Sequence, residues 1–507
     1  MAQKNILLFM TDQQRPDYVG YIPYGKVDTP NMDWIAEGSA FGACQTVNPI
    51  CTPARTALIT GRYPRQIGTL TMSGDLFHQI PTFMQALQKE GYTTYGIGKF
   101  HYLQTWPWGI PRGTGSHFIK NEEDTKRFGY DHIWETAGKQ QLNINYCYYC
   151  DYLNQKGLLE KVRDFCVTSG GKNGDTADHN YDKATPWPFD EEDYIDVVTG
   201  RKAQEYLNNH PEDKPFYMMV SFCGPHKTYD APQRYIDMFE LETDDDFILQ
   251  EGQSLSEEEK TILYKQRQSA RAMVKLIDDQ IGEILELLRR KGKLDDTLII
   301  LTSDHGDMLG DHYMIQKGVP WKQASTVPLA IRLPGYKKSG IIDSPVELTD
   351  IAATILDYAG LDPEIALSRP WPAYNDLIPC RSLLPVVKGE ADSIRDYTFT
   401  ETDFTEERHQ DSNIEETIKK RGDGRSNAWQ MIQTAGYKYI KYLGYTEPGN
   451  YHEELYDLGK DPDELHNAAA DPRYAEVVRL SRDRLMYIMD HYPPAQKVWA
   501  KVNAADL

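Results

Sequence analysis

Acidic and imidazole side chains follow two apolar segments of the chain, in a pattern typical of a metal site. Asp12 comes just after the first apolar run, and Gln13 adds an amide oxygen. Asp304 and His305 come just after a second apolar run, 297–302. Carboxylate and amide oxygens with one imidazole suit a divalent cation. We therefore predict that these four side chains hold one metal ion, which would bind the oxygens of an anionic substrate.

A cysteine lies at the start of a predicted helix, in the segment Cys51-Thr52-Pro53-Ala54-Arg55. A helix that begins near Pro53 points its N-terminal amides at position 51 and favours an anion there. Arg55 lies on the first turn and adds a fixed positive charge. The alternative is an ordinary buried cysteine before a helix that begins with proline.

Basic side chains beside other apolar segments, or beside the metal-binding loop, form a third group: Lys99, His101, His226 and Lys317. Each one alone is more simply explained as a solvated lysine or a hydrogen-bonded core histidine. Because all four share this placement, we predict that they neutralise an anion and transfer protons.

Alternating strands and helices are predicted to position these residues. Apolar strands are predicted at 5–10, 92–98, 216–222 and 297–302. Helices are predicted at 31–41, 80–90 and, most clearly, 257–291. This alternation favours an α/β fold with a large, mainly parallel sheet flanked by helices on both faces. In such a sheet, ligands bind at the carboxyl ends of the strands, where the candidate residues lie.

The last quarter of the chain has a different pattern. Strand-like patterns occur at 396–403 and 428–443, and a helix is predicted at about 473–491. We therefore expect a catalytic α/β domain over 1–385. A smaller C-terminal α+β subdomain over 386–507 would contain a small antiparallel sheet and a terminal helix.

The segment from Cys51 to Arg62 resembles the C-x-P-x-R signature of formylglycine-dependent (type I) sulfatases, in the alkaline phosphatase superfamily. Further matches follow in the family's order: Gly98-Lys99-Phe100-His101, Gly224-Pro225-His226 and Gln316-Lys317-Gly318. The resemblance covers nearly the whole chain. It implies an alkaline-phosphatase-like fold and hydrolysis of a sulfate ester of a carbohydrate or aryl alcohol. It also implies that a formylglycine-generating maturase converts Cys51 to 3-oxoalanine (formylglycine).

The resemblance also implies roles for the site residues. Hydrated residue 51, itself a metal ligand, attacks sulfur while the metal and the signature arginine stabilise it. Lys99 and Lys317 neutralise charge on the sulfuryl oxygens. His226 or Lys317 protonates the departing alcohol, and His101 takes a proton so that sulfate can leave. The assignment of acid and base among the last three residues stays open.

The chain departs from the family's usual metal ligands at two positions. Gln13 stands where the family usually has aspartate, and His305 where it usually has asparagine. The amide removes one negative charge, and imidazole suits manganese or zinc better than calcium. We expect Ca²⁺, with Mn²⁺, Mg²⁺ and Zn²⁺ as alternatives.

Other functions stay open. A phosphonate monoester or phosphodiester hydrolase on the same scaffold would use the same cations, and such relatives resemble the variant pattern at Gln13 and His305. A two-metal phosphatase or phosphomutase is less favoured, because ligands are found for one metal. A sulfoglycan-binding protein without formylglycine would not require Cys51, Arg55 and His101 together. Aromatic and polar residues that are candidates to line the substrate pocket include His78, Tyr102, Trp106 and Trp108.

The composition bears on partners and location. A net charge of -21 disfavours nucleic acid and anionic membranes as partners. No apolar run approaches the about 18 residues of a membrane span. The apolar run near the N-terminus is too short for a secretory signal, so we expect a cytoplasmic location. Cys147 and Cys150, two of seven cysteines, form one C-x-x-C pair and are expected to be plain thiols. The oligomeric state is not predicted.

Overall fold

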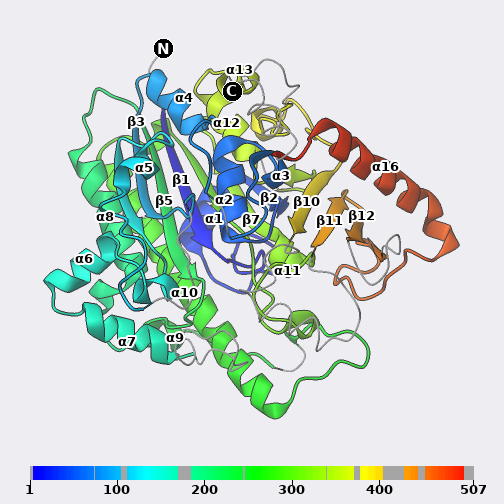
Figure 1. Ribbon diagram of the computed structural model, residues 1–507, viewed down its shortest axis with the longest axis horizontal. Helices are drawn as coiled ribbons and strands as arrows, with labels where there is room; N and C mark the ends of the chain where they lie inside the picture. Colours follow the sequence, from blue (N-terminus) through cyan, green and yellow to red (C-terminus); the bar gives the residue numbers. More distant parts are fainter. Residues whose placement is uncertain are drawn as a thin grey trace.

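A large sheet covered by helices on both faces dominates the computed structural model, with a smaller sheet beside it (Figure 1). The structure describes residues 4–72, 75–103, 111–169, 184–243, 246–337, 340–369, 377–403, 428–443 and 452–495. Within these residues, no helix is both long and apolar enough to cross a bilayer.

The large sheet has the strand order β4-β3-β5-β1-β6-β7-β2-β8, and β9 pairs with β2. Its strands are β1 (Asn5–Asp12), β2 (Ser39–Gln45), β3 (Thr93–Lys99), β4 (His132–Thr136), β5 (Phe216–Pro225), β6 (Thr297–Ser303), β7 (Thr326–Arg332), β8 (Ile341–Ile342) and β9 (Val346–Glu347). The strands from β4 to β6 in this order are parallel to one another. Strand β7 is antiparallel to both β6 and β2. The prediction of a mainly parallel sheet is confirmed.

Two apolar cores lie on opposite faces of this sheet. Because side chains alternate along a strand, Leu7 and Phe9 of β1 join one core, and Ile6 and Leu8 join the other. The first core includes helices α1 (Pro30–Ala36), α8 (Ile195–Asn209) and α10 (Glu257–Arg290). The second includes α2 (Cys51–Thr60), α4 (Phe83–Lys89) and α12 (Asp350–Tyr358). Strand β1 is therefore buried on both faces and has a fixed position.

Further helices complete the large domain. They are α3 (Pro64–Ile67), α5 (Glu122–Lys126), α6 (Tyr148–Gln155), α7 (Leu159–Ser169), α9 (Gln233–Ile236), α11 (Lys322–Ser325), α13 (Pro363–Ala366) and α14 (Leu384–Val387). The long helix α10 begins where Ser256 and Glu259 form a reciprocal capping box, with the Ser256 hydroxyl accepting from the Glu259 amide at 3.2 Å.

One predicted helix, 31–41, is wrong in its second half. Helix α1 ends at Ala36, and residues 39–41 begin β2, where Ser39 pairs with Ile331 of β7. Gly38 allows this change of direction, since a Cβ there would lie 2.7 Å from the Arg332 Cα. Pairing with a distant strand therefore overrides the local helical pattern.

The smaller sheet is antiparallel and lies beside β2 and β9 of the large sheet. Its strands are β10 (Thr398–Asp403), β11 (Ala428–Gln433), β12 (Tyr437–Tyr442) and β13 (Glu453–Asp457). Helix α16 (Ala475–His491) covers one face, and its Leu485 and Ile488 pack in a core shared with Phe399. The same core includes Ala57 of α2. The division at residues 385 and 386 stays a prediction.

A buried ion network joins the two sheets. Arg395 pairs with Glu347 at 3.0 Å and with Asp350, and the backbone amide of Phe399 donates to Glu347 at 2.6 Å. Burial raises the pKa of Glu347 to about 7 in spite of the Arg395 charge. The two carboxylates thus depend on one guanidinium, and the small sheet begins against one of them.

We predict that Arg395→Ala lowers the free energy of unfolding by about 3–5 kcal/mol, because it leaves two buried carboxylates without their cation. The deficit should be larger at pH 8 than at pH 6, because loss of Arg395 raises the pKa of Glu347 further. The variant therefore keeps losing stability above about pH 7, where the wild-type protein no longer does. Thermal and denaturant unfolding measure the loss. Lys337→Ala is the control, because it breaks only an exposed pair with Glu37. A deficit as small as that of the control would contradict the network.

Candidate active site

The carboxyl ends of β1 and β6 bring Asp12 and Asp304 together. The strands are parallel neighbours, with Thr11 paired to Ser303, so the residue that follows each pair lies at the same edge of the sheet. The backbone amide of Gln13 donates to Asp304 Oδ1 at 3.0 Å, and the backbone amide of His305 donates to the same oxygen at 2.9 Å. These bonds fix the Asp304 carboxylate toward the end of β1.

Helix α2 delivers Cys51 to this edge. The helix begins at Cys51, two residues earlier than predicted, after Ile50 in an extended conformation. Cys51 is 1% exposed, and its Sγ lies 3.2 Å from His305 Nε2 and 3.7 Å from Asp12 Oδ1. The helix N-terminus therefore points at a buried sulfur that faces the two strand ends.

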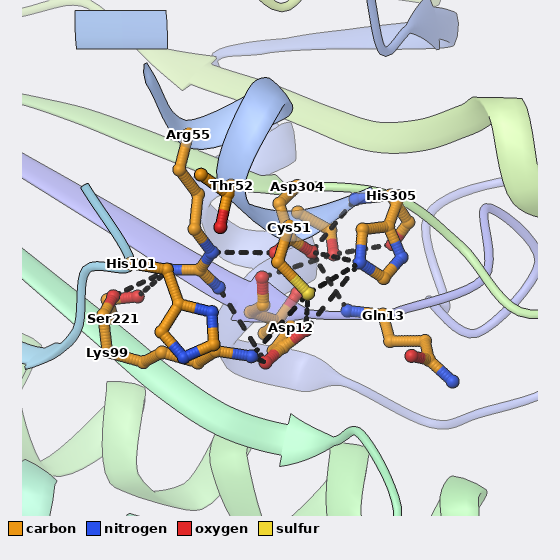
Figure 2. Close-up of polar contacts among 12 residues, drawn as sticks. Asp12, Gln13, Cys51, Thr52, Arg55, Lys99, His101, Ser221, Asp304 and His305 are labelled. Carbon is orange, nitrogen blue, oxygen red and sulfur yellow. Dashed lines mark hydrogen bonds and ion pairs between the residues drawn. The ribbon is translucent and has the colours of Figure 1, made fainter. Parts of the chain in front are cut away.

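A metal ion would find suitable donor atoms in this cluster (Figure 2). Asp12, Cys51, Asp304 and His305 each offer one ligand atom, and these atoms all lie within 4.8 Å of one another. His305 Nδ1 lies 3.0 Å from the Gly306 carbonyl oxygen, which only accepts, so Nδ1 carries the proton. The lone pair of Nε2 then faces the cluster, and the donor set fits one divalent cation.

Arg55 and Lys99 balance the two carboxylates. Arg55 Nε donates to Asp304 Oδ2 at 2.7 Å, and Lys99 forms an ion pair with Asp12. Burial opposes ionisation of Asp12, but Lys99 and the other nearby cations outweigh it and hold the pKa of Asp12 well below its usual value. Asp304 and Asp12 raise the pKa of Arg55 in spite of burial. The cations predicted to bind an anion are thus part of the site.

Lys317 reaches the same sulfur from another loop. Its Nζ lies 3.0 Å from Cys51 Sγ, and Lys99 Nζ lies 3.6 Å from it. Burial and Asp12 oppose ionisation of the thiol, but Lys317 and Lys99 outweigh them, and the pKa of Cys51 is lowered to about 7. Position 51 therefore stabilises negative charge.

His101 and His226 are held as neutral imidazoles. Burial and Lys99 lower the pKa of His101 well below its usual value, and its buried Nδ1 has no hydrogen-bond partner among the described residues. Burial and Lys317 lower the pKa of His226 well below its usual value. The Nδ1 of His226 lies 2.7 Å from the Lys227 carbonyl oxygen and carries the proton, so its Nε2 is an acceptor.

The side chain of Gln13 turns away from the four-residue cluster (Figure 2). Its Oε1 accepts a hydrogen bond from Lys317 at 2.9 Å, and its Nε2 donates to Asp307 at 2.5 Å. Residue Gln13 has a φ of 68°, in the left-handed region, and this carries the backbone across to the Asp304 loop.

Two residues of this network were not predicted. Ser221 Oγ accepts from Arg55 Nη1 at 2.8 Å, and Asp307 holds Gln13. Asp307 stands in the segment Ser303-Asp304-His305-Gly306-Asp307, so its closeness to the metal ligands was a usable signal. Ser221 lies inside an apolar strand, and nothing in the sequence separates it from a core serine.

Two of the candidate pocket residues lie in the described part of the chain, and both pack against aromatic side chains. Tyr102 is 2% exposed and stacks on Phe100, and His78 stacks on Phe128, so both pack in the second core region. Trp106 and Trp108 lie outside the described residues. Cys147 and Cys150 are buried free thiols whose sulfurs lie 3.6 Å apart.

Comparison with protein families gives two matches. A model described as Sulfatase matches residues 4–361, and one described as N-sulphoglucosamine sulphohydrolase, C-terminal, matches residues 310–491. The chain belongs to the sulfatase family. The sulfatase match contains every predicted catalytic and metal-binding residue, and the enzyme is accordingly a hydrolase of sulfate esters.

This sulfatase is similar over almost its whole length to other sulfatases. It is 29% identical to the arylsulfatase of Clostridium perfringens, over 95% of this chain and 93% of the relative. It is 25% identical to the N-acetylglucosamine-6-O-sulfatase of Bacteroides thetaiotaomicron, over 96% and 87%. Its fold matches that of the phosphonate monoester hydrolase of Agrobacterium radiobacter, with a TM-score of 0.72 at 24% identity over 97% and 96% of the two chains. The alkaline-phosphatase-like fold is thus confirmed.

We predict that Gly306→Ala lowers kcat/KM of the sulfatase by at least about tenfold, because the new Cβ would lie 1.9 Å from the Gln323 carbonyl oxygen. Relief of this clash would shift the backbone that orients His305. Gly436→Ala is the control, because a Cβ there meets nothing within 4 Å. Steady-state kinetics and thermal unfolding of both variants measure the effect. Activity of Gly306→Ala equal to that of the control would contradict a rigid metal-binding loop.

Proposed function

We propose that this sulfatase uses a formylglycine made from Cys51, beside one divalent cation, to hydrolyse the sulfate ester of a carbohydrate or aryl alcohol. The arrangement of Lys99, Lys317, Asp12 and His305 around the Cys51 sulfur supports the proposal. A maturase acting on the C-x-P-x-R segment would be the partner that makes the modification.

The residues that would hold the cation are Asp12, Asp304, His305 and the modified residue 51. Ca²⁺ remains our first expectation, and His305 keeps Mn²⁺, Mg²⁺ and Zn²⁺ as alternatives. When bound, the cation would supply Lewis acidity toward the sulfuryl oxygens and the oxygen of residue 51. Gln13 was predicted as a further ligand, but its side chain turns away from these four residues, and its Oε1 accepts from Lys317.

The thiol of Cys51 stands in for the oxygen that would attack sulfur. Hydrated formylglycine would supply this oxygen and a second hydroxyl that lets sulfate leave without an outside water. Lys317 and Lys99 lower the pKa of the Cys51 thiol to about 7, and the same charges would favour an anionic oxygen there. Lys99 and Lys317 would also neutralise charge on the sulfuryl oxygens.

Acid and base roles follow from the protonation of the three candidates. His226 has a lowered pKa, and its Nε2 is unprotonated, so it is suited to accept a proton or a hydrogen bond. His101, whose pKa is also lowered, is suited to take a proton from residue 51. Lys317 is an ammonium that carries donor hydrogens only. We therefore assign protonation of the departing alcohol to Lys317.

The organic part of the substrate is proposed from the relatives. Relatives along nearly the whole chain include an arylsulfatase, an N-acetylglucosamine-6-O-sulfatase and a choline-sulfatase. A phosphonate monoester hydrolase shares the fold at 24% identity, which supports that alternative less well. A sulfated carbohydrate or aryl sulfate is the class that we propose.

The first test uses enzyme co-expressed with a maturase. We expect the peptide that contains residue 51 to have the mass of the aldehyde form, and kcat/KM to be at least about tenfold higher for sulfate esters than for a phenylphosphonate monoester or a phosphodiester. Chelation should abolish activity, and added Ca²⁺ should restore it. Cys51→Ala is the inactive control. A higher kcat/KM for the phosphonate or phosphodiester would reject the sulfate preference, and full activity with unmodified Cys51 would reject the formylglycine.

The second test separates Lys317 from His226 by leaving group. Lys317→Ala should lower kcat by about 10²–10⁴ on an alkyl sulfate, whose alkoxide needs a proton, and much less on 4-nitrophenyl sulfate. His226→Ala should affect both substrates by similar factors. The opposite pattern, with His226→Ala sensitive to the leaving group, would give the acid role to His226.

A further inference from the structure

Asp307 is a buried carboxylate beside the site, and it belongs to neither the metal cluster nor the cations around residue 51. Its exposed fraction is 2%. Its Oδ2 accepts hydrogen bonds from Gln13 Nε2 at 2.5 Å and from the Tyr229 hydroxyl at 2.8 Å. Its Oδ1 accepts from the Leu309 amide at 3.2 Å. Both oxygens are thus used to hold neighbouring groups in place.

We propose that Asp307 is a positioning residue that fixes the amide of Gln13 and thereby aims the Lys317 ammonium at position 51. This inference rests on the role proposed above for Lys317. It concerns how that lysine is held, and not whether it acts as the acid.

The directions of two hydrogen bonds fix the orientation of the Gln13 side-chain amide. A carboxylate only accepts and an ammonium only donates, so an amide between them satisfies both in one orientation. Gln13 turns Nε2 to Asp307 and Oε1 to Lys317, and Lys317 Nζ then lies 2.9 Å from Oε1 and 3.0 Å from Cys51 Sγ. The flipped amide would set oxygen against carboxylate and NH₂ against ammonium, and the first of these contacts is buried while the second is half-buried.

The backbone that carries Asp307 is itself held firmly. Arg15 Nη1 donates to the Met308 carbonyl oxygen at 3.1 Å and forms an ion pair with Asp311 at 2.8 Å. Gln13 is fixed at its other end, because its backbone amide donates to Asp304 Oδ1 at 3.0 Å. The Gln13 side chain therefore has little freedom to follow a displaced lysine.

Because the Gln13 side chain is uncharged, it holds Lys317 without neutralising the ammonium. A glutamate at residue 13, which has the same length as Gln13, would form an ion pair with Lys317 and compete with residue 51 for the ammonium. The amide accepts one hydrogen bond without cancelling the charge. The negative charge stays on Asp307, on the far side of the amide. Lys317 is thus oriented, while its charge remains available to a sulfate ester and its leaving group.

A double-mutant cycle on the full-length, mature enzyme tests the proposal. Asp307→Asn can present either polarity to Gln13, so the amide loses its fixed orientation. It should lower kcat on an alkyl sulfate by about tenfold, with little change in KM and a smaller effect on 4-nitrophenyl sulfate. In a Lys317→Ala background, the same change should lower kcat less than about twofold, because the group that it positions is gone.

Asp278→Asn is the control. It removes a buried carboxylate that accepts from the Asn31 and Met32 backbone amides at 3.1 and 2.8 Å, at the start of α1, and not from Gln13. Its effect should fall on thermal stability, equally on both substrates, and add to that of Lys317→Ala. If Asp307→Asn does not fold, Gln13→Met replaces it in the cycle, since it removes both amide hydrogen bonds at similar size.

The outcomes separate the two proposals. The positioning role is overturned, and the role of Lys317 stands, if Lys317→Ala is impaired on the alkyl sulfate but Asp307→Asn gives one of three results. It leaves kcat unchanged, it lowers kcat equally on both substrates, or its effect adds to that of Lys317→Ala in the double variant. If Lys317→Ala hydrolyses the alkyl sulfate normally, the proposed acid and the positioning role both fail.

Discussion

Buried charge at the carboxyl ends of β1 and β6 is the constraint on which the rest of the structure depends. Asp12 and Asp304 are 1% and 0% exposed, and removing two carboxylates from water is costly unless each meets a cation at short range. Lys99 and Arg55 supply those cations from β3 and α2. The pairing tolerates little displacement, so the strands and the helix must be held rigidly by the cores on both faces of the sheet.

Arg55 is the point at which this rigidity is enforced. Its guanidinium donates to Asp304, to the Lys99 carbonyl oxygen at 2.5 Å and to Ser221 at 2.8 Å. These partners belong to β3 and β5 and to the loop after β6, so one side chain of α2 fixes three elements of the sheet to the helix that carries Cys51. A lysine could not do this, since it lacks the planar fork of donors. The signature arginine therefore organises the site as well as adding charge.

The sequence predicts the strand ends well because the strands that carry them are long, apolar and buried on both faces. The runs before Asp12 and Asp304 become β1 and β6, and residues 257–291 become α10. Strand β2 is missed, because its pairing with β7 joins residues almost three hundred positions apart and leaves no local pattern. The orientation of Gln13 is equally hidden. It depends on the hydrogen bond to Asp307 and on the positive φ of Gln13, and the residues next to Gln13 in the sequence predict neither.

The protonation of the histidines follows from the same concentration of cations. In the proposed mechanism Lys99 and Lys317 neutralise the sulfuryl oxygens, and each ammonium or guanidinium near an imidazole disfavours a further positive charge. The pKa values of His101 and His226 are lowered for this reason together with burial. A site that binds its anion through lysine and arginine thus keeps its histidines as proton acceptors. In the proposed mechanism the proton for the leaving alcohol comes from a group that is positively charged in the site, and Lys317, held by the neutral amide of Gln13, is such a group.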